Sequence, residues 1–258
     1  MIDPHIEREI QTKLTETQRL HNVQVLYACE SGSRAWGFAS EDSDYDVRFI
    51  YAHPREWYLT IDEKRDVIEL PVNEILDIGG WELRKALQLM RKSNSVIYEW
   101  LQSPIVYRDE FNFLDDMRHV MPEYFNLRAG THHYLSMARN TFEQDLQEDN
   151  VRIKRYFYAL RPLFSAMWII EHNAVPPMMF EPLRSILKDD DVQLAIDELL
   201  KIKQSSDEKA LITPITQINQ MIARELSRCA EAVRLLPLQE NSSKSLNTLF
   251  VKVLDDER

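Results

Sequence analysis

Glycine and cysteine are both scarce in this chain of 258 residues, and each shortage narrows the possible fold classes. With only five glycines, a protein built mainly of strands and tight turns is disfavoured, and each glycine is expected to have a backbone role. The two cysteines, Cys29 and Cys229, lie far apart and outside any CxxC or Cys/His cluster. A disulfide framework and a zinc site are therefore disfavoured, and a reducing compartment is expected.

Long apolar runs and an excess of positive charge are also missing. No apolar run approaches the roughly 20 residues needed to span a bilayer, and residues 1–11 lack the apolar core of a signal peptide. We therefore expect a cytoplasmic protein that makes no membrane contact. The formal net charge is −11, and a broad acidic surface repels nucleic-acid backbones. General DNA coating is thus disfavoured, whereas a local basic groove that binds one RNA end is compatible with this net charge.

The first part of the chain combines strand and helix patterns. Residues 3–20 have apolar side chains at helical spacing, with Asp3 as a cap and Pro4 in the first turn. Short runs rich in apolar and β-branched residues predict strands, and those on either side of Pro71 are expected to be adjacent strands or one bulged strand. The predicted strands are 23–28, 47–52, 66–72 and 74–80, and further helices are predicted over 81–93 and 95–102.

The remainder of the chain is predicted to be helical. A weak apolar run near the C-terminus, residues 246–254, is expected to dock as a helix or to fray. We therefore predict an α+β protein with two domains: a mixed-sheet domain over residues 1–108 and a helical domain over 109–258. The helices expected in the second domain cover 110–121, 126–148, 152–172, 181–203 and 213–236.

The chemistry is predicted to lie in residues 30–50, ESGSRAWGFASEDSDYDVRFI. Gly32 and Ser33 follow one predicted strand, and Asp44 and Asp46 open the next. Residues two apart in a strand point to the same face, so both carboxylates would meet one or two hard cations. The Gly-Ser turn would present backbone N–H groups and a hydroxyl to an anion. A phosphate donor held by Mg²⁺ fits this pattern, which predicts nucleotidyl transfer; the alternative is a plain turn followed by a solvated acidic loop.

These motifs resemble a known family. GS…DSDYDV is similar to the nucleotidyltransferase signature of the DNA polymerase beta superfamily, and GSRAWGFASEDSDYD resembles its bacterial and phage branch, which includes the RNA-ligase-associated (RlaP-like) group. Gly37 and Ser43 match the further glycine and serine of that branch. The resemblance is strongest over residues 30–107, and it implies a polymerase-beta-like mixed sheet that bears the carboxylates, followed by a helical region. One departure is Ser95, where the family usually has proline.

The superfamily usually supplies a third carboxylate from a neighbouring strand. Asp77 is the preferred candidate, because it lies near the end of a predicted strand and precedes WELRKAL, which resembles the family's helix start. Asp66 and Glu69 are competitors on the preceding β-rich run. The alternative role of Asp77 is to cap the helix that follows it.

The resemblance implies a two-metal mechanism. Two Mg²⁺ ions about 4 Å apart would bridge the triphosphate of an NTP and activate an attacking hydroxyl. Asp44 and Asp46 would bridge the ions, and Asp77 would hold the catalytic ion and help to deprotonate the acceptor. Ser33 would donate a hydrogen bond to a β- or γ-phosphate oxygen, and Gly32 would allow close backbone approach.

Four further residues are candidates for nucleotide binding. Lys85, on the predicted helix 81–93, would reach the triphosphate or the acceptor unless it is simply solvated. Lys154, Tyr158 and Arg161 are spaced i, i+4 and i+7, so they share one helical face that would suit a nucleobase and a triphosphate. The alternative is a partly buried helix whose charges pair with the acidic surface.

The predicted function is transfer of a nucleoside monophosphate from an NTP to an unidentified acceptor: an RNA end, a protein or a small molecule. Two alternatives keep the same fold. One is a module that senses nucleotides without turnover, and the other is a component of a toxin–antitoxin pair that acts on a partner. The intact carboxylates favour the enzyme. The sequence leaves open the preferred NTP, the acceptor and the oligomeric state.

Overall fold

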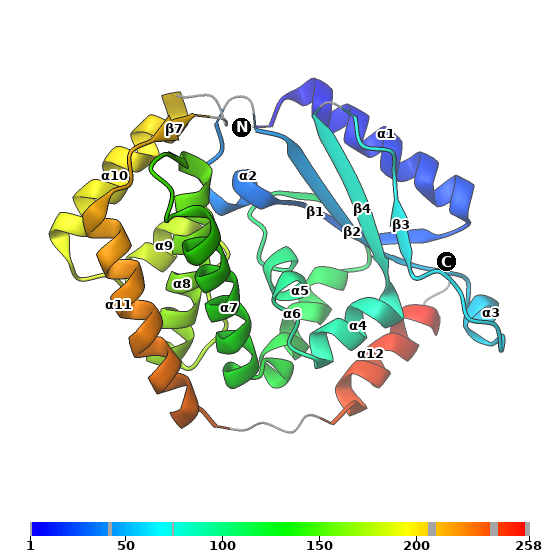
Figure 1. Ribbon diagram of the computed structural model, residues 1–258. Helices are drawn as coiled ribbons and strands as arrows, with labels where there is room; N and C mark the ends of the chain where they lie inside the picture. Colours follow the sequence, from blue (N-terminus) through cyan, green and yellow to red (C-terminus); the bar gives the residue numbers. More distant parts are fainter. Residues whose placement is uncertain (1, 41–42, 74, 206–209, 238–241, 256–258) are drawn as a thin grey trace. The chain divides into compact units, whose positions relative to one another are not determined.

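A computed structural model describes residues 2–40, 43–73, 75–205, 210–237 and 242–255. The chain forms two compact units, drawn together in Figure 1. The sheet unit consists of Met1–Ala35, Asp44–Tyr124 and Asn241–Arg258, and the helical unit consists of Trp36–Ser43 and Phe125–Glu240. The predicted boundary near residue 108 cuts the chain once, whereas each observed unit is assembled from separate segments.

The sheet unit is built on five strands in the order β3-β4-β2-β1-β5. The central neighbours β2 and β4 run parallel, whereas the other neighbouring pairs are antiparallel. This mixed sheet confirms the predicted α+β class. The strands are β1 (Gln24–Ser31), β2 (Tyr45–Ala52), β3 (Val67–Glu69), β4 (Leu76–Glu82) and β5 (Val106–Asp109).

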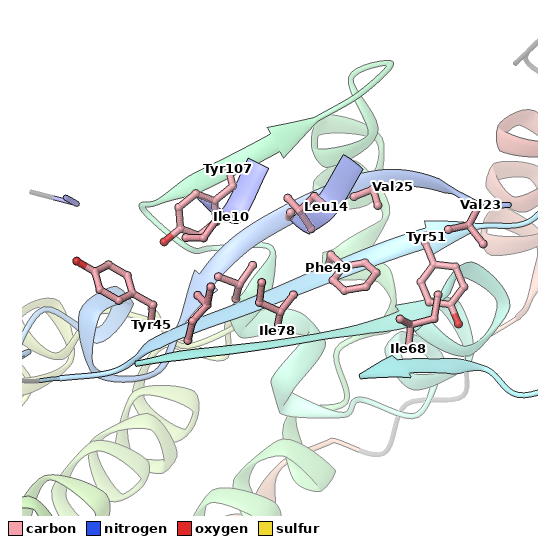
Figure 2. Close-up of a cluster of buried hydrophobic side chains, with 13 residues drawn as sticks. Ile10, Leu14, Val23, Val25, Tyr45, Phe49, Tyr51, Ile68, Ile78 and Tyr107 are labelled. Atoms are coloured by element: carbon pink, nitrogen blue, oxygen red, sulfur yellow. The ribbon is translucent and has the colours of Figure 1, made fainter. Parts of the chain in front are cut away.

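One face of this sheet is covered by helix α1 (Pro4–His21), whose side chains join the core drawn in Figure 2. The Asp3 carboxylate caps α1 by accepting a hydrogen bond from the His5 N–H, and Ile10 and Leu14 on α1 are fully buried. Because successive strand residues point to opposite faces, the odd-numbered residues of β2 enter this core. Among them are Tyr45, Val47, Phe49 and Tyr51.

The other face of the sheet carries α4 (Leu83–Arg91), α5 (Ser95–Trp100) and α6 (Phe113–Tyr124), with α12 (Lys244–Asp255) packed against α4 and α6 (Figure 1). Trp81 of β4 stacks on Trp100 of α5 with 3.9 Å between ring centroids. The short helix α3 (Arg55–Tyr58) follows β2. The C-terminal apolar run, residues 246–254, lies within α12, so it docks as a helix on the sheet unit.

The helical unit is formed mainly by α7 (Leu127–Asp145), α8 (Ile153–His172) and α11 (Thr216–Ala232), which pack against one another. The single helix predicted over 181–203 is wrong: the chain there forms α9 (Phe180–Arg184) and then α10 (Asp190–Ser205). In the part of the chain that is described, no helix has the length and apolar character required to cross a membrane. The unit also contains β6 (Val151–Arg152), β7 (Leu211–Ile212) and a 3₁₀ turn, η1 (Val233–Leu235).

Two element boundaries near the predicted site differ from the sequence analysis. The strand predicted over 23–28 continues to Ser31, and Gly32 then opens the short helix α2 (Gly32–Trp36). The run predicted over 74–80 begins with Glu74, which lies outside the described residues; the observed strand β4 extends to Glu82. Asp77 therefore lies at the start of its strand, not near its end.

Candidate active site

Strand pairing places two of the predicted carboxylates side by side. In the parallel ladder between β2 and β4, Asp46 pairs in register with Asp77. Register partners on neighbouring strands point to the same face of a sheet. Asp44 is exposed and lies one residue before β2. The competing reading of Asp77 as a helix cap is wrong, because the α4 cap is Glu82, which accepts from the Arg84 and Lys85 N–H groups.

The two carboxylates converge on one cationic side chain, that of Arg48. Its Nη2 lies 2.7 Å from Asp77 Oδ2 and 3.3 Å from Asp46 Oδ1. Because the same nitrogen is within reach of both oxygens, a single cation can contact both carboxylates. Hard carboxylate oxygens are the ligands that Mg²⁺ prefers, so the donor set fits a divalent metal. In the described residues, however, no group of three or more His, Cys, Asp or Glu side chains is placed to hold one.

Gly32 lies directly against Asp46. Its φ of +65° is in the left-handed region that favours glycine, and a Cβ added there would collide with Asp46 Oδ2. Ser31 pairs with Asp46 across β1 and β2, so Gly32 and Ser33 follow at the same edge of the ladder. Because Gly32 has no side chain, the Asp46 carboxylate can lie in the space that a Cβ would fill.

A buried glutamate, Glu30, supports this arrangement from β1. Its Oε1 accepts a hydrogen bond from the Asp46 N–H at 2.8 Å, and its Oε2 accepts one from the Tyr107 hydroxyl. The side chain is 0% exposed. Burial raises the pKa of Glu30 to about 7, although both hydrogen bonds favour the charged form. Glu30 fixes the backbone from which Asp46 projects.

The competing carboxylates lie farther along the sheet. Glu69 is on β3, opposite Gly79, and it pairs with Arg65 at 3.2 Å. The Asp66 carbonyl accepts from the Glu82 N–H, which places Asp66 at the opposite end of β4 from Asp77. Of the three candidates for a third carboxylate, Asp77 is the register neighbour of Asp46.

Lys85 is not brought to the carboxylate pair. Its Nζ lies 2.9 Å from Asp66 Oδ1, in the first turn of α4 and at the far end of β4. The two ends are separated by the five residue steps from Asp77 to Glu82, each with a rise of roughly 3.3 Å along the strand. Contact between Lys85 and a triphosphate stays a prediction.

The basic and aromatic face of α8 belongs to the helical unit. Arg161 is only 3% exposed; its Nε and Nη2 donate to the Met178 carbonyl, and its guanidinium lies 4.4 Å from the Trp36 ring centroid. Tyr158 meets Trp36 edge-on, and Lys154 lies in the first turn of the helix. The binding of a nucleotide by Lys154, Tyr158 and Arg161 stays a prediction.

Two residues that contact the carboxylate pair, Arg48 and Glu30, were not predicted from the sequence. Arg48 lies two residues after Asp46 on β2, so the spacing rule that paired Asp44 with Asp46 also predicts that Arg48 shares their face. Glu30 was missed because the preceding strand was expected to end at residue 28. A charged residue inside the observed strand β1 indicates a buried and hydrogen-bonded carboxylate.

Two comparisons with known proteins cover nearly the whole chain. Residues 6–252 match a family model described as RlaP, the RNA repair pathway DNA polymerase beta family. The chain is 41% identical over 253 residues to the uncharacterized protein YcgL of Bacillus subtilis strain 168, and the match covers 97% of each chain.

A solved structure is also similar over most of the chain. It is the crystal structure of a nucleotidyltransferase-like protein from Exiguobacterium sibiricum 255-15. The identity is 12% and the TM-score 0.32, with coverage of 98% of this chain and 80% of that one. That likeness is too distant to support a conclusion about the site. The family match spans nearly the whole sequence, and on that ground the chain belongs to the RlaP family of DNA polymerase beta-like proteins.

Proposed function

We propose that this protein is a metal-dependent nucleotidyltransferase that moves a nucleoside monophosphate from an NTP to an acceptor hydroxyl, with release of pyrophosphate. The observation that carries the proposal is the register pairing of Asp46 with Asp77, whose carboxylate oxygens share one cationic nitrogen. Membership of a polymerase-beta-like family supports the assignment of that pair to phosphoryl chemistry.

In this proposal Asp46 and Asp77, joined by Asp44, would hold Mg²⁺. The bound metal would neutralise triphosphate charge and lower the pKa of the attacking hydroxyl. Gly32 leaves room for the Asp46 carboxylate against the backbone, and the Ser33 hydroxyl would donate to a phosphate oxygen. Glu30 keeps the Asp46 backbone in place through its N–H. Catalysis of this kind depends on positioning and charge neutralisation more than on covalent chemistry.

We propose an RNA end as the acceptor, because the family is described as belonging to an RNA repair pathway. A net charge of −11 makes tight, sequence-independent binding of long duplexes unfavourable. A terminal hydroxyl presented to the carboxylate pair needs only a small binding footprint. The acceptor class therefore agrees with both the family description and the charge of the chain.

Transfer from labelled NTPs to RNA oligonucleotides with free 3′ ends tests the proposal, with protein and small-molecule acceptors run in parallel. Asp46→Asn and Asp77→Asn should each lower transfer at least about a hundredfold, because each removes a charge from the reacting centre. Asp66→Asn is the matched control: it is a carboxylate of the same unit that pairs with a lysine at the other end of β4. Undiminished transfer by Asp46→Asn would show that the site is wrong.

A further inference from the structure

Arg48 makes four hydrogen bonds at the candidate site. Its Nη1 donates to the backbone carbonyls of Val47 and Asp77, both at 3.0 Å. Its Nη2 donates to the side chains of Asp46 and Asp77. One guanidinium nitrogen thus contacts the backbone, and the other contacts the two carboxylates.

The residue opposite Arg48 leaves room for this conformation. Arg48 pairs in register with Gly79 on β4, and a Cβ added at Gly79 would lie 3.9 Å from Arg48 Nη1. A Cβ at that distance would make only an ordinary van der Waals contact, so the conformation of Arg48 does not depend on the glycine. The guanidinium lies over the neighbouring strand and turns back along it toward Asp77. Its planar fork of donors suits a backbone carbonyl and a carboxylate at the same time.

Two adjacent carboxylates repel each other unless a positive charge lies between them. Arg48 supplies that charge in the metal-free protein, and it contacts the same oxygens that a divalent cation would bind. The two cations therefore cannot both contact these oxygens in full. Release of the Nη2 contacts would still leave the Nη1 hydrogen bonds to the backbone.

We propose that Arg48 is a built-in counter-cation that keeps Asp46 and Asp77 together in the metal-free protein and competes with the incoming divalent metal for their oxygens. The inference rests on the proposed function, which supplies the metal. Metal binding then displaces Nη2 while Nη1 keeps the guanidinium beside the site. Arg48 acts here as a positioning residue that lowers the affinity of the empty site for metal.

The test measures Mn²⁺ affinity by calorimetry on the full chain, without nucleotide. Arg48→Gln should bind Mn²⁺ at least about tenfold more tightly than the wild type, because the competing charge is gone; a tenfold change corresponds to about 1.4 kcal/mol. Asp46→Asn should bind at least about tenfold more weakly, which assigns the measured site to this pair. Equal or weaker binding by Arg48→Gln overturns the proposal.

Arg65→Gln is the matched control. It breaks an arginine–carboxylate pair of the same sheet unit in which both side chains are largely exposed, so Mn²⁺ affinity should stay within about twofold of the wild type. If Arg48→Gln does not fold, Arg48→Lys replaces it. A lysine keeps the charge with fewer fixed donors, so it should tighten Mn²⁺ binding by a smaller factor, and an unchanged affinity overturns the proposal.

Failure of this inference is distinguishable from failure of the proposed function. A wild type that transfers nucleotide while Arg48→Gln gains no Mn²⁺ affinity contradicts only the role of Arg48. A gain in Mn²⁺ affinity without nucleotide transfer to any acceptor contradicts only the proposed reaction.

Discussion

The two ends of β4 carry similar charged residues in different arrangements. At its start, Asp77 and the adjacent Asp46 share the guanidinium of Arg48. At its far end, Asp66 has Lys85, and the buried Glu82 accepts hydrogen bonds from the Tyr58 hydroxyl and from two backbone N–H groups. The start therefore gathers two carboxylates on one guanidinium nitrogen, whereas at the far end each carboxylate has its own donors.

This difference separates a structural site from a site that suits an incoming cation. A buried glutamate near each end accepts a hydrogen bond from a tyrosine hydroxyl: Glu30 of β1 from Tyr107, and Glu82 of β4 from Tyr58. Only Glu30 also holds the backbone of a paired aspartate. Two carboxylates held close together in a partly buried position are costly unless a cation balances them, and Arg48 provides that balance at the start of β4.

The largest expected effect comes from Gly32→Ala. The added Cβ collides with Asp46 Oδ2, so transfer should fall at least about a hundredfold as the carboxylate is displaced. Gly37→Ala is the matched control, because Gly37 also has positive φ but an added Cβ would meet only Met179 Cε at 3.7 Å. Both variants should lose about 1–2 kcal/mol of stability from backbone strain, and only Gly32→Ala should lose activity. Equal transfer activities of the two variants would contradict the requirement for a glycine beside the Asp46 carboxylate.

Truncation of the two buried glutamates should separate stability from activity. Glu30→Ala and Glu82→Ala each remove the acceptor of a tyrosine hydroxyl and of at least one backbone N–H group. Each should therefore lower the free energy of unfolding by about 2–4 kcal/mol. Per folded molecule, transfer should fall about tenfold or more in Glu30→Ala and stay near the wild type in Glu82→Ala. Denaturant unfolding and transfer assays measure both quantities, and an equal loss of activity in the two variants would remove the special role of Glu30.

The pKa of Glu30 predicts a pH dependence of stability. Its folded pKa of about 7 exceeds the ordinary 4.5, so between these values the folded state retains a proton that the unfolded state has released. Stability should therefore fall as pH rises from about 4.5 to 7, by about 3 kcal/mol at roughly 1.4 kcal/mol per pKa unit. Glu30→Gln should show a correspondingly flatter curve in metal-free denaturant titrations. Parallel curves for the two proteins would contradict the buried protonation of Glu30.

The smallest effect is expected at the far end of β4. Lys85→Ala removes one ion pair to the half-exposed Asp66, so the free energy of unfolding should fall by less than about 1 kcal/mol. The KM for NTP should stay within about twofold of the wild type, because Lys85 lies away from the carboxylate pair. A large rise in KM would instead support the prediction from sequence that Lys85 binds the triphosphate.

Local rules predicted much of the sheet unit. The apolar runs located β2, β3 and β4 to within a few residues. The shared face of Asp44 and Asp46, expected from strand alternation, stays a prediction, because Asp44 lies one residue before β2. The strand order is set by long-range pairing, so the register partnership of Asp46 with Asp77 was beyond spacing arguments. Asp77 was preferred for the resemblance of WELRKAL to a family motif and for its place near the end of the predicted strand, and the second ground was wrong.

The errors have local physical causes. Gly79 and Gly80 look like the end of a strand, yet β4 continues because the Phe49 ring lies against Gly80, where an added Cβ would collide with it.

The amphipathic pattern of α12 predicts a docked helix but not which core receives it. It packs with α4 and α6 in the sheet unit, far in sequence from both.

The central claim is that Asp46 and Asp77 bind the metal that nucleotidyl transfer requires. Anomalous diffraction from crystals soaked with Mn²⁺ and a non-hydrolysable NTP analogue tests it most directly. We expect an anomalous peak within bonding distance, about 2.0–2.3 Å, of oxygens from both aspartates, with Arg48 Nη2 withdrawn from them. A peak confined to Asp66 and Glu82 at the other end of β4, or none on the Asp46–Asp77 pair, would contradict the claim.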